Sequence, residues 1–174
     1  MQKNRGELYG EIQDSLITNE DATIEKVTRV LDAHSSIGEN DIVIIHMAGH
    51  GVKDVSGTFY FLTSTVQSID NPQEGGLSWT LLNTYISRIK ARVILFLDAC
   101  HSGSLVTETV VPNDRLAQEF FSGKRGAVMV FSASKGRQYS MESPDIGAGA
   151  GIFTFALTQG LSAKSKLVDI NNNG

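Results

Sequence analysis

Cysteine is nearly absent from this sequence: the chain of 174 residues has one, Cys100. A single thiol excludes an internal disulfide, and such usage fits either a reducing compartment or a thiol kept for its chemistry. Proline is also scarce, with three residues and no proline-rich linker. No boundary divides the chain, and its length is that of one ordinary domain, so residues 1–174 are predicted to form a single domain.

Long apolar runs and runs of basic residues are missing as well. No apolar stretch reaches the ~18 residues that cross a membrane, and the segment Met1–Glu7 lacks the apolar core of a signal peptide. The net charge is −4, without the basic face that a nucleic-acid-binding protein usually carries. The sequence therefore predicts a cytoplasmic protein with neither a membrane nor a nucleic acid as its partner.

Hydrophobic residues make up 41% of the chain and charged residues 20%, a composition that favours a folded core. Apolar, β-branched runs predict buried strands, and apolar residues at helical spacing predict helices. Asp21 and Ser78 are the predicted caps of the first two helices. This alternation predicts an α/β fold with a largely parallel sheet flanked by helices. We expect strands at 12–18, 42–45, 59–62, 93–97 and 127–131, and helices at 23–33, 78–90, 115–121 and 153–161.

Small and polar residues follow three of the predicted strands. These segments are Met47–Gly51, Asp98–Gly103 and Ser132–Gly136. Ligands bind beyond the carboxyl ends of the strands in open parallel sheets. We therefore expect the three segments to meet at one crevice.

Cys100 and His50 are the residues of these segments that are suited to nucleophilic catalysis. A thiolate is the nucleophile of cysteine enzymes, and a nearby imidazole lowers the thiol pKa and shuttles the proton. Gly49 and Gly51, on either side of the histidine, would let a substrate backbone approach closely. The backbone N–H groups of Gly51 and Cys100 would stabilise the oxyanion that forms in acyl transfer.

Taken singly, each of these two residues has a plainer interpretation. A lone cysteine is more often a small buried hydrophobe, and a lone histidine is more often structural. Their joint spacing favours catalysis, because His50 lies fifty positions before Cys100 in the segment Asp98-Ala99-Cys100-His101-Ser102-Gly103. A cysteine before a glycine-containing turn, with a histidine about fifty residues upstream, is typical of one class of cysteine peptidase.

The chain resembles the caspase-like cysteine peptidases, and most of all their metacaspase and bacterial orthocaspase branch. The resemblance rests on four stretches spread over most of the chain: 48–51, 98–103, 132–142 and 151–157. It implies the caspase-like fold and cysteine endopeptidase activity. It also implies a catalytic dyad with Cys100 as the nucleophile and His50 as the proton shuttle, with no cofactor required for the chemistry.

Charge at two positions predicts the specificity of such an enzyme. Caspases cleave after Asp and have a Gln two residues before the cysteine and an Arg in a later Ser-Trp-Arg segment. Here those positions hold Asp98 and Glu142. An acidic S1 pocket repels an Asp side chain and pairs with Arg or Lys, so we expect protein or peptide substrates with a basic P1 residue, as the resemblance to metacaspases also implies. The plainer interpretations are a turn-capping carboxylate at Asp98 and a solvated charge at Glu142.

Self-processing and activation by calcium are further properties that the resemblance suggests. Arg115, Lys124 and Arg125 lie in or just after a predicted surface segment and would suit self-cleavage after basic residues, although a solvated basic face is the plainer interpretation. Residues 169–174 match only the first six positions of a calcium-binding loop, which is weak support for a calcium site. No metal ligands are assigned, calcium activation stays open, and a monomer is expected.

Two alternatives to the peptidase stay open. Members of the family usually begin with an apolar strand before the segment that starts here near Leu8, so the first strand is expected to be missing and the domain incomplete at its N-terminus. The first alternative is a non-catalytic caspase-like scaffold that binds a partner through an exposed sheet edge. The second is an α/β redox or acyl-transfer enzyme, which is disfavoured because neither a resolving cysteine nor a phosphate-binding glycine loop occurs.

Overall fold

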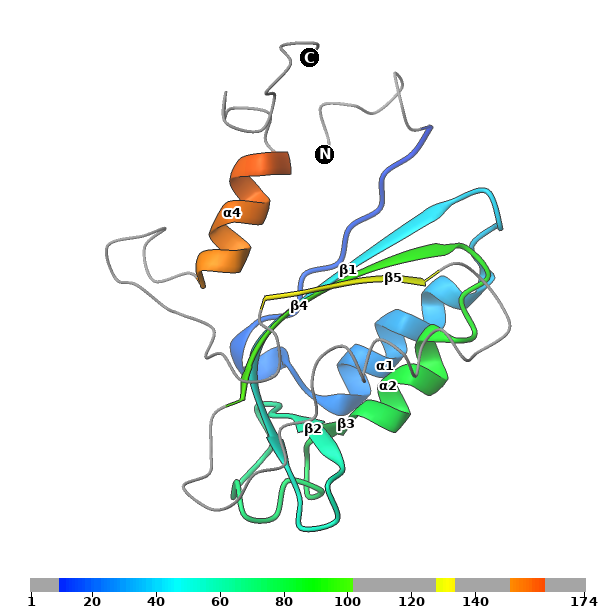
Figure 1. Cartoon of the computed structure of the whole chain (residues 1–174). Coiled ribbons are helices and arrows are strands. Elements are labelled where there is room, and N and C mark those ends of the chain that lie inside the picture. Colours follow the sequence, from blue (N-terminus) through cyan, green and yellow to red (C-terminus); the bar gives the residue numbers. More distant parts are fainter. Residues whose placement is uncertain (1–9, 102–127, 134–150, 162–174) are drawn as a thin grey trace. The chain divides into compact units, whose positions relative to one another are not determined.

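A computed structural model of the chain describes residues 10–101, 128–133 and 151–161. The contacts divide the chain into two units, Ile17–Ser140 on the one hand and Met1–Leu16 with Met141–Gly174 on the other. The first unit contains a five-stranded sheet (Figure 1). The described part of the second unit contains helix α4 (Ile152–Leu161), close to the predicted helix at 153–161. The prediction of a single domain stays a prediction.

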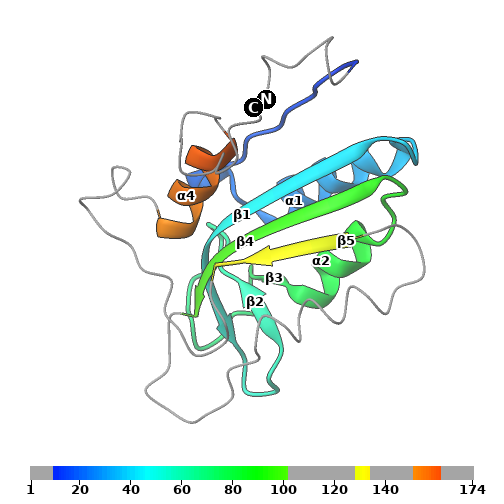
Figure 2. The ribbon, with the colours of Figure 1, turned by 45° about the horizontal axis from the view of Figure 1, so that its top comes forward.

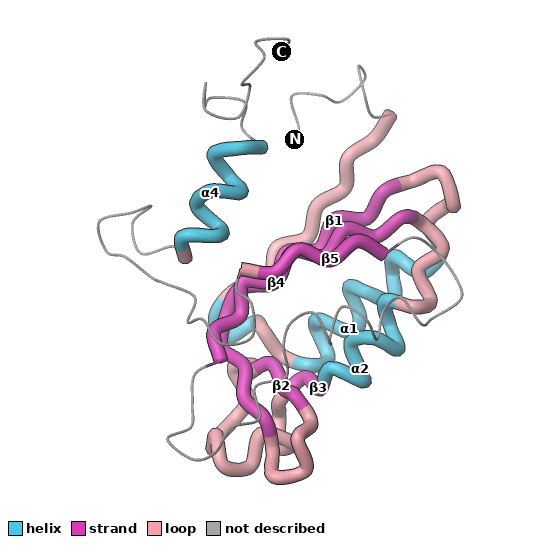
Figure 3. Tube along the Cα trace, in the orientation of Figure 1, coloured by secondary structure: helices cyan, strands magenta, loops and turns pink. Residues whose placement is uncertain are grey.

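The sheet has the strand order β3-β2-β1-β4-β5. Three neighbouring strands run parallel: β1 (Ile42–Lys53), β4 (Arg92–His101) and β5 (Val128–Ser132). A hairpin turns β1 back into β2 (Phe59–Phe61), which pairs with β3 (Leu77–Ser78), so the other edge of the sheet is antiparallel (Figure 3). The α/β fold with a largely parallel sheet is therefore confirmed, with an antiparallel extension.

The core lies on one face of the sheet. Helices α1 (Ile24–Ala33) and α2 (Trp79–Ile86) lie side by side against that face (Figure 2). Strand side chains alternate between faces with a period of two, which sends every second residue of β4 into the core. The residues shared by the helices and the sheet in this core include Leu31, Val43, Leu82, Ile86, Val93, Leu95 and Leu97.

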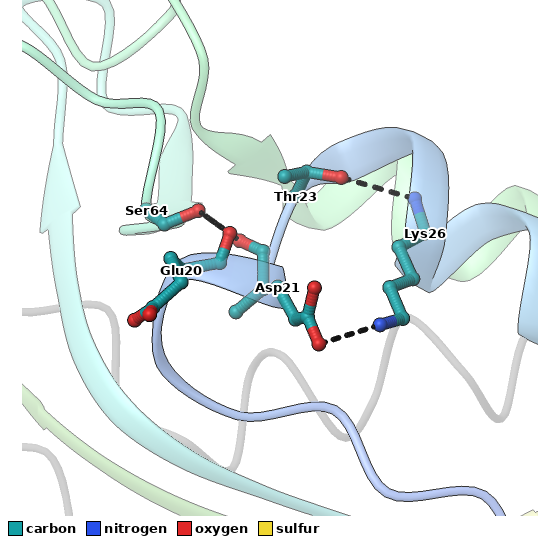
Figure 4. Close-up of polar contacts among 6 residues, drawn as sticks. Glu20, Asp21, Thr23, Lys26 and Ser64 are labelled. Carbon is teal, nitrogen blue, oxygen red and sulfur yellow. Dashed lines mark hydrogen bonds and ion pairs between the residues drawn. The ribbon is translucent and has the colours of Figure 1, made fainter.

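Local hydrogen bonds determine where the two helices begin. The Ser78 hydroxyl accepts from the Leu81 N–H at 3.2 Å, so Ser78 caps α2 as predicted. The predicted cap of α1 is wrong: the hydroxyl of Thr23, not the carboxylate of Asp21, accepts from the Lys26 N–H. Asp21 instead forms an ion pair with the Lys26 ammonium at 2.7 Å (Figure 4).

The turn before α1 is tied to the loop that follows β2. The Ser64 hydroxyl donates to the Glu20 carbonyl at 2.9 Å (Figure 4), and the Ser64 N–H donates to the Ala22 carbonyl at 3.0 Å. These bonds join segments more than forty residues apart in the sequence. They fix the loop that leaves β2 against the start of α1.

Three predicted elements differ from the structure or lie outside it. The predicted strand at 12–18 is absent, and its side chains are mostly exposed, with Leu16 at 83%. The predicted helix at 78–90 ends at Ile86, because the chain then turns and brings Ile89 into the core. The predicted helix at 115–121 lies outside the described residues.

Replacing Ser78 with Ala removes an acceptor from the first turn of α2, and the free energy of unfolding should fall by about 1 kcal/mol. Urea denaturation followed by circular dichroism measures the change. Ser87→Ala is the matched control, because the Ser87 hydroxyl donates to the Thr84 carbonyl at the exposed C-terminal end of the same helix. We expect the control to lose less than about 0.5 kcal/mol. Equal losses would contradict a capping role for Ser78.

Candidate active site

His50 and Cys100 are register partners on the neighbouring parallel strands β1 and β4. Adjacent strands lie about 4.8 Å apart, so sheet pairing alone brings the backbones of the two residues together. Between them the chain forms the hairpin to β2, then β3 and α2, and returns in register. The structure thus brings together the two positions that the sequence predicts as a dyad.

The sequence predicts that His50 and Cys100 lie just after strands. In the structure both positions lie inside strands, in β1 and β4. The pairing of β1 with β4 runs without a break from Ile42 opposite Arg92 to Gly51 opposite His101. The strands continue through small residues because β1 is paired on both sides at its end, with β4 and with β2. Local propensity favours a loop there, and non-local pairing overrides it.

The three parallel strands run in the same direction, and β5 ends opposite Leu97, before β4 ends at His101. In β5, Ser132 pairs with Leu97 of β4, and the Ala133 N–H donates to the Leu97 carbonyl at 2.9 Å. The segments that follow the three apolar runs therefore start from adjacent strands. The structure shows that the three strands are adjacent and parallel, and the meeting of the three segments at one crevice stays a prediction.

The candidate dyad lies on the face of the sheet opposite to α1 and α2. In β1, Val43 points into the core and is 8% exposed, whereas Ile44 is 39% exposed. His50 is an even number of residues from Ile44, belongs to the same face, and is exposed. Register partners of paired strands share a face, so position 100 of β4 lies on this face as well.

Asp98 lies on the same face, two positions before Cys100 and opposite Ala48. Asp98 is 5% exposed, and it is the one buried polar or charged residue among those whose burial the structure describes. A buried acidic residue thus stands next to the candidate dyad. Glu142, Arg115, Lys124 and Arg125 lie outside the described residues, and their roles stay predictions.

Strand β2 holds the backbone of His50. The His50 carbonyl accepts from the Leu62 N–H at 2.9 Å, and the next pair along the ladder is Gly51 with Phe61. Antiparallel ladders alternate between hydrogen-bonded and non-hydrogen-bonded pairs. Because His50 bonds to Leu62, Gly51 falls in a non-hydrogen-bonded pair and its N–H is directed away from β2, toward the β4 side.

The two glycines beside His50 differ in their surroundings. A Cβ built on Gly49 meets no atom within 4 Å, so the space above Gly49 is open. A Cβ on Gly51 would lie 2.2 Å from the Cζ of Phe59. The Phe59 ring fills the core side of Gly51, on the face opposite to that of His50, so the prediction that these glycines admit a substrate backbone stays a prediction. Sequence reasoning missed Phe59, and its only signal was an aromatic Phe59-Tyr60-Phe61 strand soon after the histidine.

The turn between β1 and β2 is built around the Asp54 carboxylate. Its Oδ1 accepts from the Ser56 N–H at 2.9 Å, the Ser56 hydroxyl at 2.6 Å and the Thr58 N–H at 2.9 Å. These bonds, led by that of the Ser56 hydroxyl, lower the pKa of Asp54 although partial burial opposes them. Burial, and then the charge of Asp54, raise the pKa of Tyr60. Gly57, with φ of +86°, supplies the left-handed residue of the turn.

The described ranges hold neither a cluster of metal ligands nor a helix that could cross a membrane. There, no three or more His, Cys, Asp or Glu side chains gather in a group that could hold a metal ion. Calcium activation therefore gains no ligand set from these residues and stays a prediction. No helix in these ranges is long and apolar enough to span a bilayer.

Comparison with known proteins gives one informative result. The sequence model of the caspase domain matches residues 11–172, which is nearly the whole chain. The match includes His50, Asp98 and Cys100. A search of curated proteins finds no significant match.

The charge of Asp54 should make the stability of the fold depend on pH. The pKa of Asp54 is lower in the folded chain than its ordinary value of 3.8, so its contribution is fully present above that value and is lost as the pH falls through the folded-state pKa. Wild type should be more stable than Asp54→Asn near pH 6, and the difference should shrink below roughly pH 4. Urea denaturation at a series of pH values measures it.

Asn keeps an oxygen acceptor at this position, so the comparison isolates the charge of Asp54. Asp14→Asn, at an exposed position, controls for the change in net charge. A stability difference for Asp54→Asn that stays constant from pH 6 to pH 3, or one that Asp14→Asn reproduces, would contradict the role assigned to Asp54.

Proposed function

The chain belongs to the caspase-domain family of cysteine peptidases, and we propose that it is an endopeptidase of the metacaspase or orthocaspase branch. In this proposal it cleaves after Arg or Lys, with Cys100 as the nucleophile and His50 as the proton shuttle. The observation that carries the proposal is the register of β1 and β4, which pairs these two residues on adjacent strands.

The proposed reaction has two steps. His50 takes the proton of the Cys100 thiol, and the thiolate attacks the scissile carbonyl carbon. The C–N bond then breaks, the amine leaves with the proton from His50, and the acyl group stays on the sulfur. Water, deprotonated by His50, attacks this thioester and releases the carboxylic acid, and the proton returns to the thiol.

The backbone supplies candidate donors for the oxyanion of both steps. The Gly51 N–H is directed away from β2 toward β4, and the pairing of these strands runs through His50 opposite Cys100 to Gly51 opposite His101, so this N–H has to leave the β1–β4 ladder to act as a donor. A preorganised N–H donor stabilises the negative charge that develops on the carbonyl oxygen. We assign this role to the N–H groups of Gly51 and Cys100.

Asp98 is the residue proposed to select a basic P1 side chain. It is 5% exposed and lies two positions before the nucleophile on the same face of the sheet. Attraction between opposite charges is stronger at a site shielded from water than in bulk solvent. A guanidinium or ammonium group would be attracted there, and an Asp side chain would be repelled. Glu142 is proposed to add a second negative charge.

The remaining parts of the proposal rest on the family resemblance. They are a monomer, chemistry that requires no cofactor, activation by calcium as an open possibility, and self-processing at Arg115, Lys124 or Arg125; the proposed cytoplasmic location rests instead on the single cysteine and the composition of the N-terminal segment. The competing proposal is the non-catalytic scaffold. A measurement of hydrolysis separates the two, since the scaffold predicts none by the folded, reduced protein.

Hydrolysis of matched fluorogenic peptides with Arg, Lys or Asp at P1, with and without calcium, tests the proposal. Wild type should cleave the Arg and Lys peptides, and Cys100→Ala should cleave none. Asp98→Asn should lose roughly 100-fold or more in kcat/KM on basic peptides, since breaking a buried ion pair costs ~3–5 kcal/mol. Asp70→Asn, on an exposed loop, is the matched control and should keep wild-type activity.

Each of the other outcomes overturns a specific part of the proposal. Cleavage of the Asp peptide alone would reject Asp98 and Glu142 as the S1 acids and keep the peptidase. No cleavage of any peptide by a folded, reduced sample, with or without calcium, would favour the scaffold. Hydrolysis that survives in Cys100→Ala would reject the assigned nucleophile.

A further inference from the structure

The backbone beside His50 is packed against an aromatic ring from the next strand. A Cβ built on Gly51 would lie 2.2 Å from Cζ, 2.6 Å from Cε2 and 3.2 Å from Cε1 of Phe59. Distances this short mean that the ring of Phe59 occupies the place of a side chain at position 51. Gly51 is buried, and Phe59 is 3% exposed.

The register explains how the ring reaches this place. Gly51 stands opposite Phe61, while Phe59 stands opposite Lys53. Phe59 is therefore the diagonal neighbour of Gly51 on one face of the antiparallel pair, a separation that an aromatic side chain can span. The ring crosses the face of the hairpin and covers the backbone of the residue that follows His50.

The ring of Phe59 is in turn held by the core. It packs edge-to-face on Phe61, with ring centroids 5.0 Å apart. Phe61 contacts Trp79, the first residue of α2, with centroids 6.1 Å apart. Both partners are buried, at 7% and 3% exposed. A continuous row of aromatic rings thus links the start of α2 to the backbone of β1.

We propose that Phe59 is a positioning residue for His50. Its ring presses on the inner side of Gly51, the Leu62 N–H holds the His50 carbonyl, and together they fix where β1 presents the imidazole to position 100 of β4. The proposal rests on the proposed function, because it concerns the reactivity of the same dyad. An error in placement of about 1 Å can cost about 100-fold in rate.

The test uses Cys100 as its own probe, because the chain has one cysteine. Alkylation of the full-length protein by iodoacetamide, followed by intact mass at a series of pH values, gives the apparent pKa of the thiol. In wild type this pKa should lie below about 8.5, the value of a free cysteine. His50→Ala should bring it back toward that value. Neither measurement needs a peptide substrate.

Four variants separate positioning from general packing. Gly51→Ala should raise the thiol pKa toward that of His50→Ala. Phe59→Leu lacks the Cε and Cζ atoms that a Cβ at position 51 would meet, so adding it to Gly51→Ala should restore much of the wild-type profile. Phe59→Leu alone should lower kcat on the Arg peptide about tenfold with little change in KM. Ile86→Val, in the same core, is the matched control and should change neither readout.

The outcomes are distinguishable. The proposal fails if Phe59→Leu keeps the wild-type thiol profile and kcat, if the double variant is no better than Gly51→Ala, or if Ile86→Val produces the same shift. A wild-type profile identical to that of His50→Ala would instead reject the dyad, and with it the proposed function. Thermal melting of each variant confirms that the folded protein is being compared.

Discussion

The parallel pairing of β1 with β4 is the constraint on which the rest of the site depends. It aligns ten consecutive pairs from Ile42 opposite Arg92 to Gly51 opposite His101, and it sets His50 opposite Cys100. It also decides the face, because alternate residues of both strands enter the core with α1 and α2. The candidate dyad and the buried Asp98 are left together on the other face. Core packing and site geometry therefore follow from one register.

The hairpin into β2 is the second support of the site. The Asp54 carboxylate organises the turn, the Leu62 N–H holds the His50 carbonyl, and the Phe59 ring covers Gly51. These contacts lie on the core side of β1 and along its border with β2. The side chains that make them therefore do not cover the face that carries His50. Strand pairing on both sides keeps a glycine-rich segment extended where local preference alone favours a loop. The extended conformation of this segment is therefore non-local in origin.

The sequence predicted the type of fold and placed the two candidate dyad residues near the ends of apolar runs, because both features leave local marks. Apolar runs mark β1 and β4, and His50 and Cys100 stand near the ends of those runs. It missed the true strand ends, because these depend on neighbouring strands. The predicted cap of α1 was also wrong, because Asp21 and Thr23 are both suitable acceptors. In the structure Asp21 pairs with the Lys26 ammonium, and Thr23 accepts the Lys26 N–H. The contact between Phe59 and Gly51 could not be predicted from the sequence. The need for a glycine at position 51 becomes visible only in the structure, where the Phe59 ring occupies the place of a side chain.

The common register gives the fifty-residue spacing of the candidate dyad a different meaning. His50 is eight residues from the start of β1, and Cys100 is eight residues from the start of β4. What must be preserved is the equality of these two offsets, because a slip of one residue would carry one partner to the far face of the sheet. The length of the connection through β2, β3 and α2 is not subject to this constraint. Chains of this architecture can therefore lengthen or shorten that connection, provided that the number of residues from the start of β1 to the histidine equals the number from the start of β4 to the cysteine.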